Sequence, residues 1–186
     1  IDVLNGEYWY EAPEWKAHEL QPPKDFATET KDGLSGYSRS FACWTDDFNG
    51  DGFADLIVID HPGQPCYWME NPKGKATTDD GKPLHWKKHI IWHSACNETP
   101  TYTDLLGNGK RVLVMAWQPK GGKGNEGQMA YFTPSKEPTE LWEMHPISEP
   151  STPAKVENGK EVPGTRKEIT CTQKYSHGLG VGDVNG

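Results

Sequence analysis

The hexapeptide Tyr67-Trp68-Met69-Glu70-Asn71-Pro72 decides the fold, because the chain repeats it. Tyr8-Trp9-Tyr10-Glu11-Ala12-Pro13 matches it at four of six positions, and Tyr131-Phe132-Thr133-Pro134 is a shorter third copy. An apolar run precedes each copy, and the pattern Trp-x-x-His follows it, at Trp15–His18, Trp86–His89 and Trp142–His145. Three copies of one ordered set of features indicate a repeat protein.

Each repeat predicts four short strands separated by Gly, Pro and Asp turns. The apolar runs at Asp2 and Asp55 begin 53 residues apart. A period of this size with four strands per repeat is typical of β-propeller blades. We therefore expect an all-β fold with about three four-stranded antiparallel blades. The expected single partial propeller domain covers 1–186, divided into blades at about 1–36, 37–97 and 98–174 and the start of a further blade at 175–186.

Composition excludes two classes of protein. The 186 residues carry 19 basic and 27 acidic side chains, a net charge of −8, which argues against a nucleic-acid partner. The longest apolar run, Val112 to Trp117, is far shorter than the roughly 20 residues that span a bilayer. The chain begins with residues typical of the middle of a strand and ends with residues typical of the middle of a loop. We therefore expect a segment of a longer protein with further blades.

Four cysteines lie at positions 43, 66, 96 and 171, with no Cys-x-x-Cys spacing. This spacing supports neither a zinc ribbon nor a redox motif. The side chains are either buried thiols or members of disulfides, for which full pairing allows three connectivities.

The acidic segment between two apolar runs predicts a cation site. Oxygen ligands occupy alternate positions of this loop, namely Asp47, Asn49, Asp51, the Phe53 carbonyl and Asp55. Such alternation in a curled loop suits Ca²⁺, which takes six to eight oxygens and relieves the repulsion between the carboxylates. The alternative is a solvated Asp/Asn/Gly turn. The loop is no EF-hand, because its position 12 is Val58 rather than Glu.

Two related loops follow. Asp104 to Val112 keeps the turn residues, but Leu106 and Val112 replace two of the ligands. We expect this loop to fold in the same way without metal. Asp183 and Asn185 begin a third loop, a second and truncated cation site.

The segment from Asp47 to Leu56 resembles the calcium loop of FG-GAP/VCBS repeats, which form β-propeller blades. The resemblance covers the whole chain and implies a seven-bladed ring. The Tyr-Trp-x-Glu-x-Pro strands and Tyr175 to Asp183 are similar, more narrowly, to secreted bacterial VCBS proteins and to the propeller of aldos-2-ulose dehydratases. Those enzymes are sugar lyases with a metal-bearing propeller.

Two functions follow from these features. The first is a calcium-stabilised binding module, with carbohydrate or another protein as partner, placed extracellularly, in the periplasm or on the cell surface, where calcium is abundant. The alternative is a carbon–oxygen lyase acting on keto-sugars, with His177 near the propeller channel as the candidate catalytic base and a second, catalytic metal. Whether the chain is an enzyme stays open. Its Trp and Tyr side chains either stack on sugar rings or pack between blades.

Overall fold

The computed structural model describes residues 1–25, 38–120, 127–150, 155–162, 164 and 179–185. Its secondary structure consists of strands, with no helix among these residues, and no helix there could cross a membrane. The chain divides into two compact units. Unit 1 comprises Ile1–His61 and Tyr67–His89, and unit 2 comprises Pro62–Cys66 and Ile90–Gly186. The all-β prediction is confirmed for the described residues.

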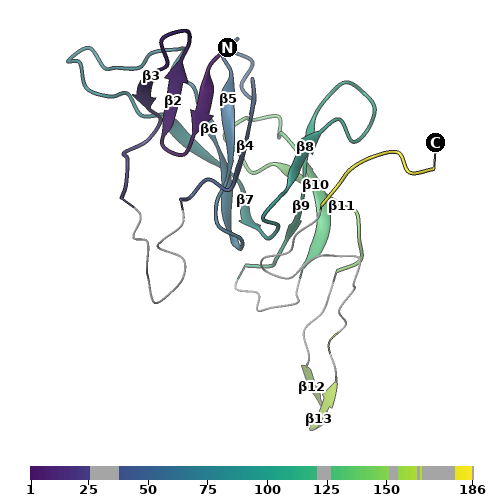
Figure 1. The fold of residues 1–186 in the computed structure, drawn as a ribbon. Helices are drawn as coiled ribbons and strands as arrows, with labels where there is room; N and C mark the ends of the chain where they lie inside the picture. Colours follow the sequence, from purple (N-terminus) through teal and green to yellow (C-terminus); the bar gives the residue numbers. More distant parts are fainter. Residues whose placement is uncertain (26–37, 121–126, 151–154, 163, 165–178, 186) are drawn as a thin grey trace. The chain divides into compact units, whose positions relative to one another are not determined.

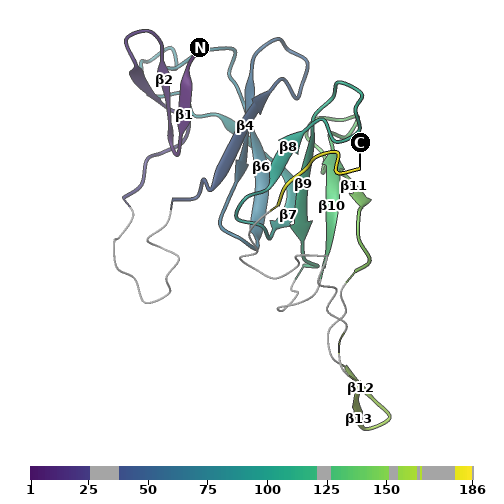
Figure 2. The same cartoon turned by 45° about the vertical axis from the view of Figure 1, so that its right-hand side comes forward.

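The strands form successive sheets along the chain (Figures 1 and 2). The first sheet contains β1 (Val3–Asn5), β2 (Tyr8–Glu11) and β3 (Lys16–Glu19). The second contains β4 (Ala42–Asp46), β5 (Asp55–Ile59), β6 (Gln64–Glu70) and β7 (Lys87–Ala95). The third contains β8 (Thr101–Thr103), β9 (Val112–Trp117), β10 (Gln128–Thr133) and β11 (Glu143–Pro146). In each sheet the strands are neighbours in chain order, and the pairs β4–β5, β5–β6, β9–β10 and β10–β11 are antiparallel.

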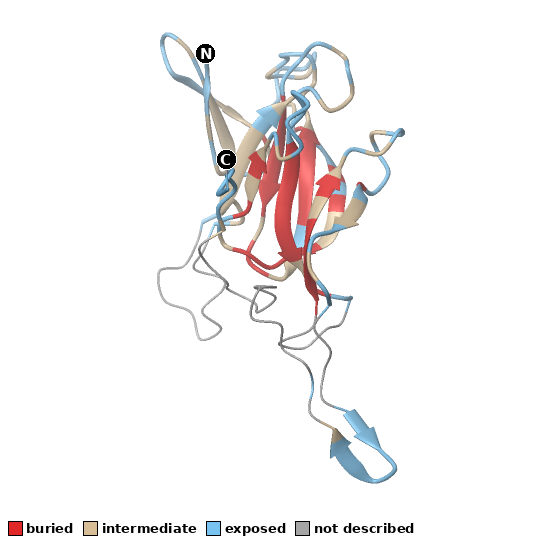
Figure 3. Ribbon diagram, turned by 90° about the vertical axis from the view of Figure 1, so that its right-hand side faces the viewer, coloured by how far each residue is buried: buried red, intermediate tan, exposed pale blue. Residues whose placement is uncertain are grey.

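The structure departs from the predicted blades in two places. The first sheet has three strands among the described residues rather than four, because the repeat at Asp2 aligns with β5, the second strand of its sheet. The segment 98–174, expected as one four-stranded blade, also contains the hairpin of β12 (Lys155–Glu157) and β13 (Lys160–Val162). Asn158 and Gly159 turn this hairpin with φ of 51° and 75°, and Figure 3 shows it mostly exposed. Successive positive φ values are typical of a type I′ turn.

In unit 1 the apolar core lies between two sheets. Leu56 and Val58 of β5 are 2% exposed and pack with Leu4 and Trp9 of the first sheet. The alternation along β5 sends these two side chains to one face. The first and second sheets of unit 1 therefore pack face to face.

In unit 2 the core gathers on one face of the third sheet. Val112, Val114 and Ala116 alternate along β9 and pack with Met129 of β10. Leu179, from the segment predicted to open a further blade, packs against the same cluster. Buried residues run along the central strands in Figure 3.

The cysteine alternatives are resolved for three positions. Cys43, Cys66 and Cys96 are free thiols, half-buried at Cys43 and buried at the other two. Burial raises the pKa of the Cys66 thiol to about 12. Cys171 lies outside the described residues.

The histidines of the Trp-x-x-His pattern make equivalent contacts in three sheets. His18 stacks on Trp9 with ring centroids 4.4 Å apart, and its Nε2 lies 2.8 Å from Glu11. His89 does the same with Trp68 at 4.3 Å, and donates to Glu70 at 2.7 Å.

In the third sheet His145 stacks on Tyr131 at 4.6 Å, and its Nε2 lies 2.9 Å from the Thr133 hydroxyl. The three stacks join the same two positions of neighbouring strands, since Trp9 is paired with His18 and Tyr131 with His145. The three histidines thus make equivalent contacts in successive sheets, which suits a structural role.

A backbone hydrogen bond also recurs, once in each unit. It joins the last strand of one sheet, or the residue after it, to the residue just before the last strand of the following sheet. The Trp86 amide donates to the Leu20 carbonyl at 2.9 Å, and the Trp142 amide donates to the Ile91 carbonyl at 3.2 Å. Leu20 and Ile91 each follow the stacked histidine by two residues and are fully buried. The repeat in the sequence is therefore a repeat of packing as well as of strands.

Candidate metal loop and aromatic pocket

The loop from Asp47 to Ala54 joins β4 to β5 in unit 1. Asp46 and Asp55 are paired across its base, so the loop closes a hairpin. Gly50 and Gly52 have φ of +74° and +87°, a region that residues with a Cβ rarely adopt. These two glycines allow the chain to curl around the side chain of Asp47.

Asp47 organises the loop from its first position. Its Oδ1 accepts the amides of Gly50 and Asp51 at 2.8 and 3.1 Å, and its Oδ2 accepts the Gly52 amide at 2.9 Å. The hydrogen bond from Gly52 is the main cause that lowers the pKa of this carboxyl. Asp47 is therefore ionised and held by backbone donors.

The next two predicted ligands fold back on the loop. Asn49 Oδ1 accepts the Asp51 amide and Asp51 Oδ1 accepts the Phe53 amide, both at 3.0 Å. Lys73 Nζ lies 4.0 Å from Asp51 Oδ2, a long ion pair that contributes little because the lysine side chain is mostly exposed. Each oxygen that accepts one N–H group keeps a lone pair that could bind a cation.

Asp55 is the unusual member of the set, because it is fully buried. Its Oδ2 accepts the Phe48 amide at 3.0 Å and its Oδ1 accepts the Asn71 amide at 2.8 Å. Burial is the main cause that raises the pKa of this carboxyl to about 6, and the charges of Asp51 and Asp47 also raise it. The hydrogen bonds from the two backbone amides act in the opposite direction and lower it. A cation bound beside Asp55 would remove this penalty.

The loop from Asp104 to Arg111 provides an internal comparison. Asp104 accepts the Asn108 amide at 3.0 Å and the Gly109 amide at 2.8 Å, and Asn108 accepts the Lys110 amide at 2.9 Å. These bonds join the same loop positions as those from Asp47 and Asp51. The prediction that this loop folds alike is confirmed, and at the place of Asp55 it has the buried Val112.

Loop shape alone therefore does not indicate a metal, and the distinguishing features are Asn49 and the buried Asp55. The donor set of three carboxylates, an amide and a carbonyl is chemically suited to Ca²⁺. In the part of the chain that the structure describes, no group of three or more His, Cys, Asp or Glu side chains is gathered as a metal site. Calcium binding stays a prediction.

The remaining predicted site residues lie near the end of the chain. Asp183 Oδ1 accepts the Asn185 amide at 3.3 Å, which is the beginning of a similar turn. His177, the candidate base of the lyase, lies outside the described residues.

Asn71 is a residue of the candidate site that the ligand spacing did not indicate. Its backbone amide donates to Asp55, while its side chain donates to the Ala54 carbonyl at 2.9 Å and accepts the Gly74 amide at 2.8 Å. Asn71 thus joins the end of β6 to the acidic loop. The only signal was its place within the repeated hexapeptide, where Ala12 stands in the first copy.

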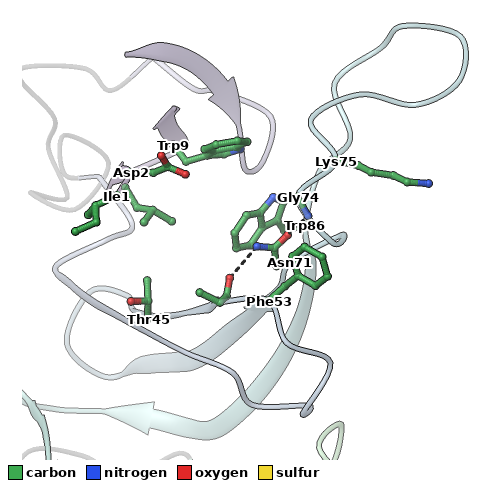
Figure 4. A pocket seen from close by; sticks show the side chains of 11 residues that line it. Ile1, Asp2, Trp9, Thr45, Phe53, Asn71, Gly74, Lys75 and Trp86 are labelled. Carbon is green, nitrogen blue, oxygen red and sulfur yellow. Dashed lines mark hydrogen bonds between the residues drawn. The ribbon is translucent and has the colours of Figure 1, made fainter. Parts of the chain in front are cut away.

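Beside the loop, unit 1 contains a pocket of about 370 Å³, which we call the aromatic pocket (Figure 4). Three rings line it, from Trp9 of β2, Phe53 of the acidic loop and Trp86 ahead of β7. Asp2 and Asn71 add polar groups to the lining. Trp9 and Trp86 pack in the apolar core, as one alternative predicted, and they also border the pocket. Stacking on sugar rings stays a prediction.

Comparison with known proteins adds no assignment: no family model matches the chain, and no curated protein or solved structure matches it. The likeness to FG-GAP/VCBS repeats therefore depends on the residues quoted above.

Proposed function

We propose that the chain forms consecutive blades of a calcium-stabilised β-propeller that acts as a binding module outside the cytosol. Its partner would be a carbohydrate or another protein. The observation that carries the proposal is the fully buried carboxylate of Asp55 within the acidic loop, at a position where the next repeat has Val112.

The propeller is supported by contacts that recur from sheet to sheet. The hydrogen bond from the Trp86 amide to the Leu20 carbonyl in unit 1 is repeated from the Trp142 amide to the Ile91 carbonyl in unit 2. Blades that meet through the same contact build a ring when the rotation from one to the next closes. Propellers typically have four to eight blades, so three repeats require further blades. The resemblance to FG-GAP/VCBS repeats favours seven.

The cation is supported by the cost of leaving Asp55 without one. A buried carboxylate that is raised in pKa by desolvation and by neighbouring charges destabilises the fold at neutral pH. Calcium would be held by Asp47, Asn49, Asp51, the Phe53 carbonyl and Asp55, and its role would be structural. Extracellular calcium modules have dissociation constants of about 0.1–1 mM, which suits an isolated loop and a location outside the cytosol.

A binding module is placed ahead of an enzyme because the described residues offer an aromatic pocket, whereas His177, the candidate base of the lyase, lies outside them. His18, His89 and His145 each stack on an aromatic ring and contact a polar side chain, which suits a structural role. The keto-sugar lyase stays the alternative.

Calorimetric titration of the chain with calcium chloride tests the cation. We expect one calcium per chain, bound at the acidic loop and lost in Asp51→Ala. Asn108→Ala is the matched control, because Asn108 holds the same turn position in the loop with Val112. Calcium binding that is equal in wild type and Asp51→Ala would contradict the assignment.

A second experiment separates module from lyase. The full-length protein, with its further blades, is incubated in calcium with 1,5-anhydrofructose and related keto-sugars while the ultraviolet absorbance of an enone product is followed. Retention on a glycan or protein array without turnover supports the module. Turnover that disappears in His177→Ala would replace the module with the lyase.

A further inference from the structure

The aromatic pocket belongs to unit 1 and is built from segments far apart in the sequence. Trp9 comes from the first sheet, Phe53 from the acidic loop, and Trp86 from the segment before β7. Its volume of about 370 Å³ lies within the range of about 300–1,000 Å³ typical of small-molecule sites. The pocket is therefore large enough for a ligand of one or two rings.

Three rings give the pocket flat apolar walls. Trp86 is 8% exposed and held in the core, whereas Phe53 is 39% exposed. Trp9 is fixed from one side by its stack on His18. Aromatic faces pack against the C–H groups of a sugar ring and orient it without using charge.

Polar groups complete the lining. Asp2 accepts the Ala12 amide with Oδ1 at 3.0 Å, and its Oδ2 makes no hydrogen bond within the described residues, so it can accept from a hydroxyl. The indole nitrogens of Trp9 and Trp86 have no acceptor in the described part of the chain, but they are enclosed, so a ligand does not reach them. A ligand hydroxyl therefore donates to the Asp2 carboxylate.

Charge disfavours anionic ring-shaped ligands. A nucleotide or an acidic sugar would bring negative charge to Asp2 on a chain of net charge −8. Figure 4 shows the Lys75 side chain directed away from the three rings, so it does not provide a cation inside the pocket. Among saccharides, the complementary ligand is therefore neutral.

The pocket and the acidic loop share a wall. The Phe53 amide donates to Asp51, its carbonyl is the predicted calcium ligand, and its ring lines the pocket. Asn71 lines the pocket with its side chain and holds Asp55 with its amide. A cation that fixes the loop would therefore also fix the Phe53 ring.

We propose that the aromatic pocket binds one or two neutral hexopyranose units, and that calcium in the acidic loop strengthens this binding by fixing Phe53. The inference rests on the proposed calcium-stabilised binding module and names the ligand class and the site.

The test uses a glycan array in calcium, followed by titration of the best neutral glycan while tryptophan fluorescence is measured. We expect neutral glycans to bind and to change the fluorescence, with weaker binding after calcium is removed with EGTA. Binding confined to acidic glycans, or no glycan binding at all, would overturn the inference. Calcium calorimetry of the same sample shows separately whether the proposed calcium-stabilised module fails.

Phe53→Ala is the decisive variant, because it removes the ring but keeps the backbone carbonyl. We expect saccharide affinity to fall about tenfold, the value of one aromatic contact, with calcium stoichiometry unchanged. Leu106→Ala is the matched control, since Leu106 is also an exposed apolar side chain of a β-hairpin loop but lies outside the pocket. Wild-type saccharide affinity in Phe53→Ala would refute the placement of the site.

Discussion

Replacing Asp55 with asparagine is expected to stabilise the fold in the absence of calcium and to destabilise it in its presence. The Asp55 carboxyl is buried, and its pKa rises from the ordinary 3.8 to about 6. Holding it ionised at neutral pH therefore costs about 3 kcal/mol in the metal-free fold. Asp55→Asn removes that charge, but its amide nitrogen opposes one of the two backbone donors, which costs about 1–2 kcal/mol. In EGTA at neutral pH the variant should be more stable by about 1–2 kcal/mol.

The pH dependence follows from the same pKa. Because the folded-state value lies above the unfolded one, the contribution of Asp55 to stability is fully present below about pH 4 and is lost as pH rises through about 6. The metal-free wild type should lose about 3 kcal/mol over this interval from Asp55. Asp55→Asn should lack this component. Calcium reverses the order, since the ionised carboxylate is a ligand and asparagine is a weaker one.

Urea unfolding, followed by tryptophan fluorescence at several pH values with EGTA or calcium, measures both effects. Asp104→Asn is the control, because Asp104 is the exposed first residue of the related loop. The reasoning fails if wild type is more stable than Asp55→Asn in EGTA at neutral pH. It fails equally if the two proteins show the same dependence on pH between 4 and 7.

Three further predictions concern the scaffold. His89→Ala should lower the free energy of unfolding by about 2 kcal/mol, since it removes a buried stack on Trp68 and a hydrogen bond; urea unfolding with His89→Gln as the comparison measures this. Gly127→Ala should lower the melting temperature and the strand content in circular dichroism, because φ there is +117° and a Cβ would overlap the Trp117 carbonyl. An unaltered melting curve would contradict that account. Cys66 should resist Ellman's reagent in the native protein and react only in urea, because burial raises its pKa to about 12.

Much of the fold could be predicted because the repeat marks each strand separately. The apolar run at Asp55–Ile59 and the Tyr-Trp strand at Gln64–Glu70 are where the hexapeptide and its spacing placed them. The hairpin at Lys155–Val162 was missed although Asn158-Gly159 is a strong turn signal. Its strands are short and highly charged, so no alternation of apolar and polar residues supported the turn.

The candidate sites were predictable only where their residues are neighbours in the sequence. The acidic loop is one continuous segment, so spacing indicated its ligands directly. The aromatic pocket joins Asp2, Phe53 and Trp86, which only the packing of two sheets brings together. The burial of Asp55 was likewise invisible, because it depends on the amide of Asn71 at the end of another strand.

Asp2 and Asp55 hold equivalent positions in the first two repeats, whereas the third repeat has Val112 there. The contacts of these residues show why. Asp2 accepts the Ala12 amide at 3.0 Å, as Asp55 accepts the Asn71 amide at 2.8 Å. The third repeat has Val112 at this position. The strand register pairs Leu56 with Met69 and Leu113 with Phe132, so the residue equivalent to Asn71 is Pro134, which has no N–H group. Val112→Asp should therefore destabilise the chain by several kcal/mol even in calcium, because a buried carboxylate would lack its backbone donor. Urea unfolding that leaves Val112→Asp as stable as wild type would show that the donor is not what permits the carboxylate.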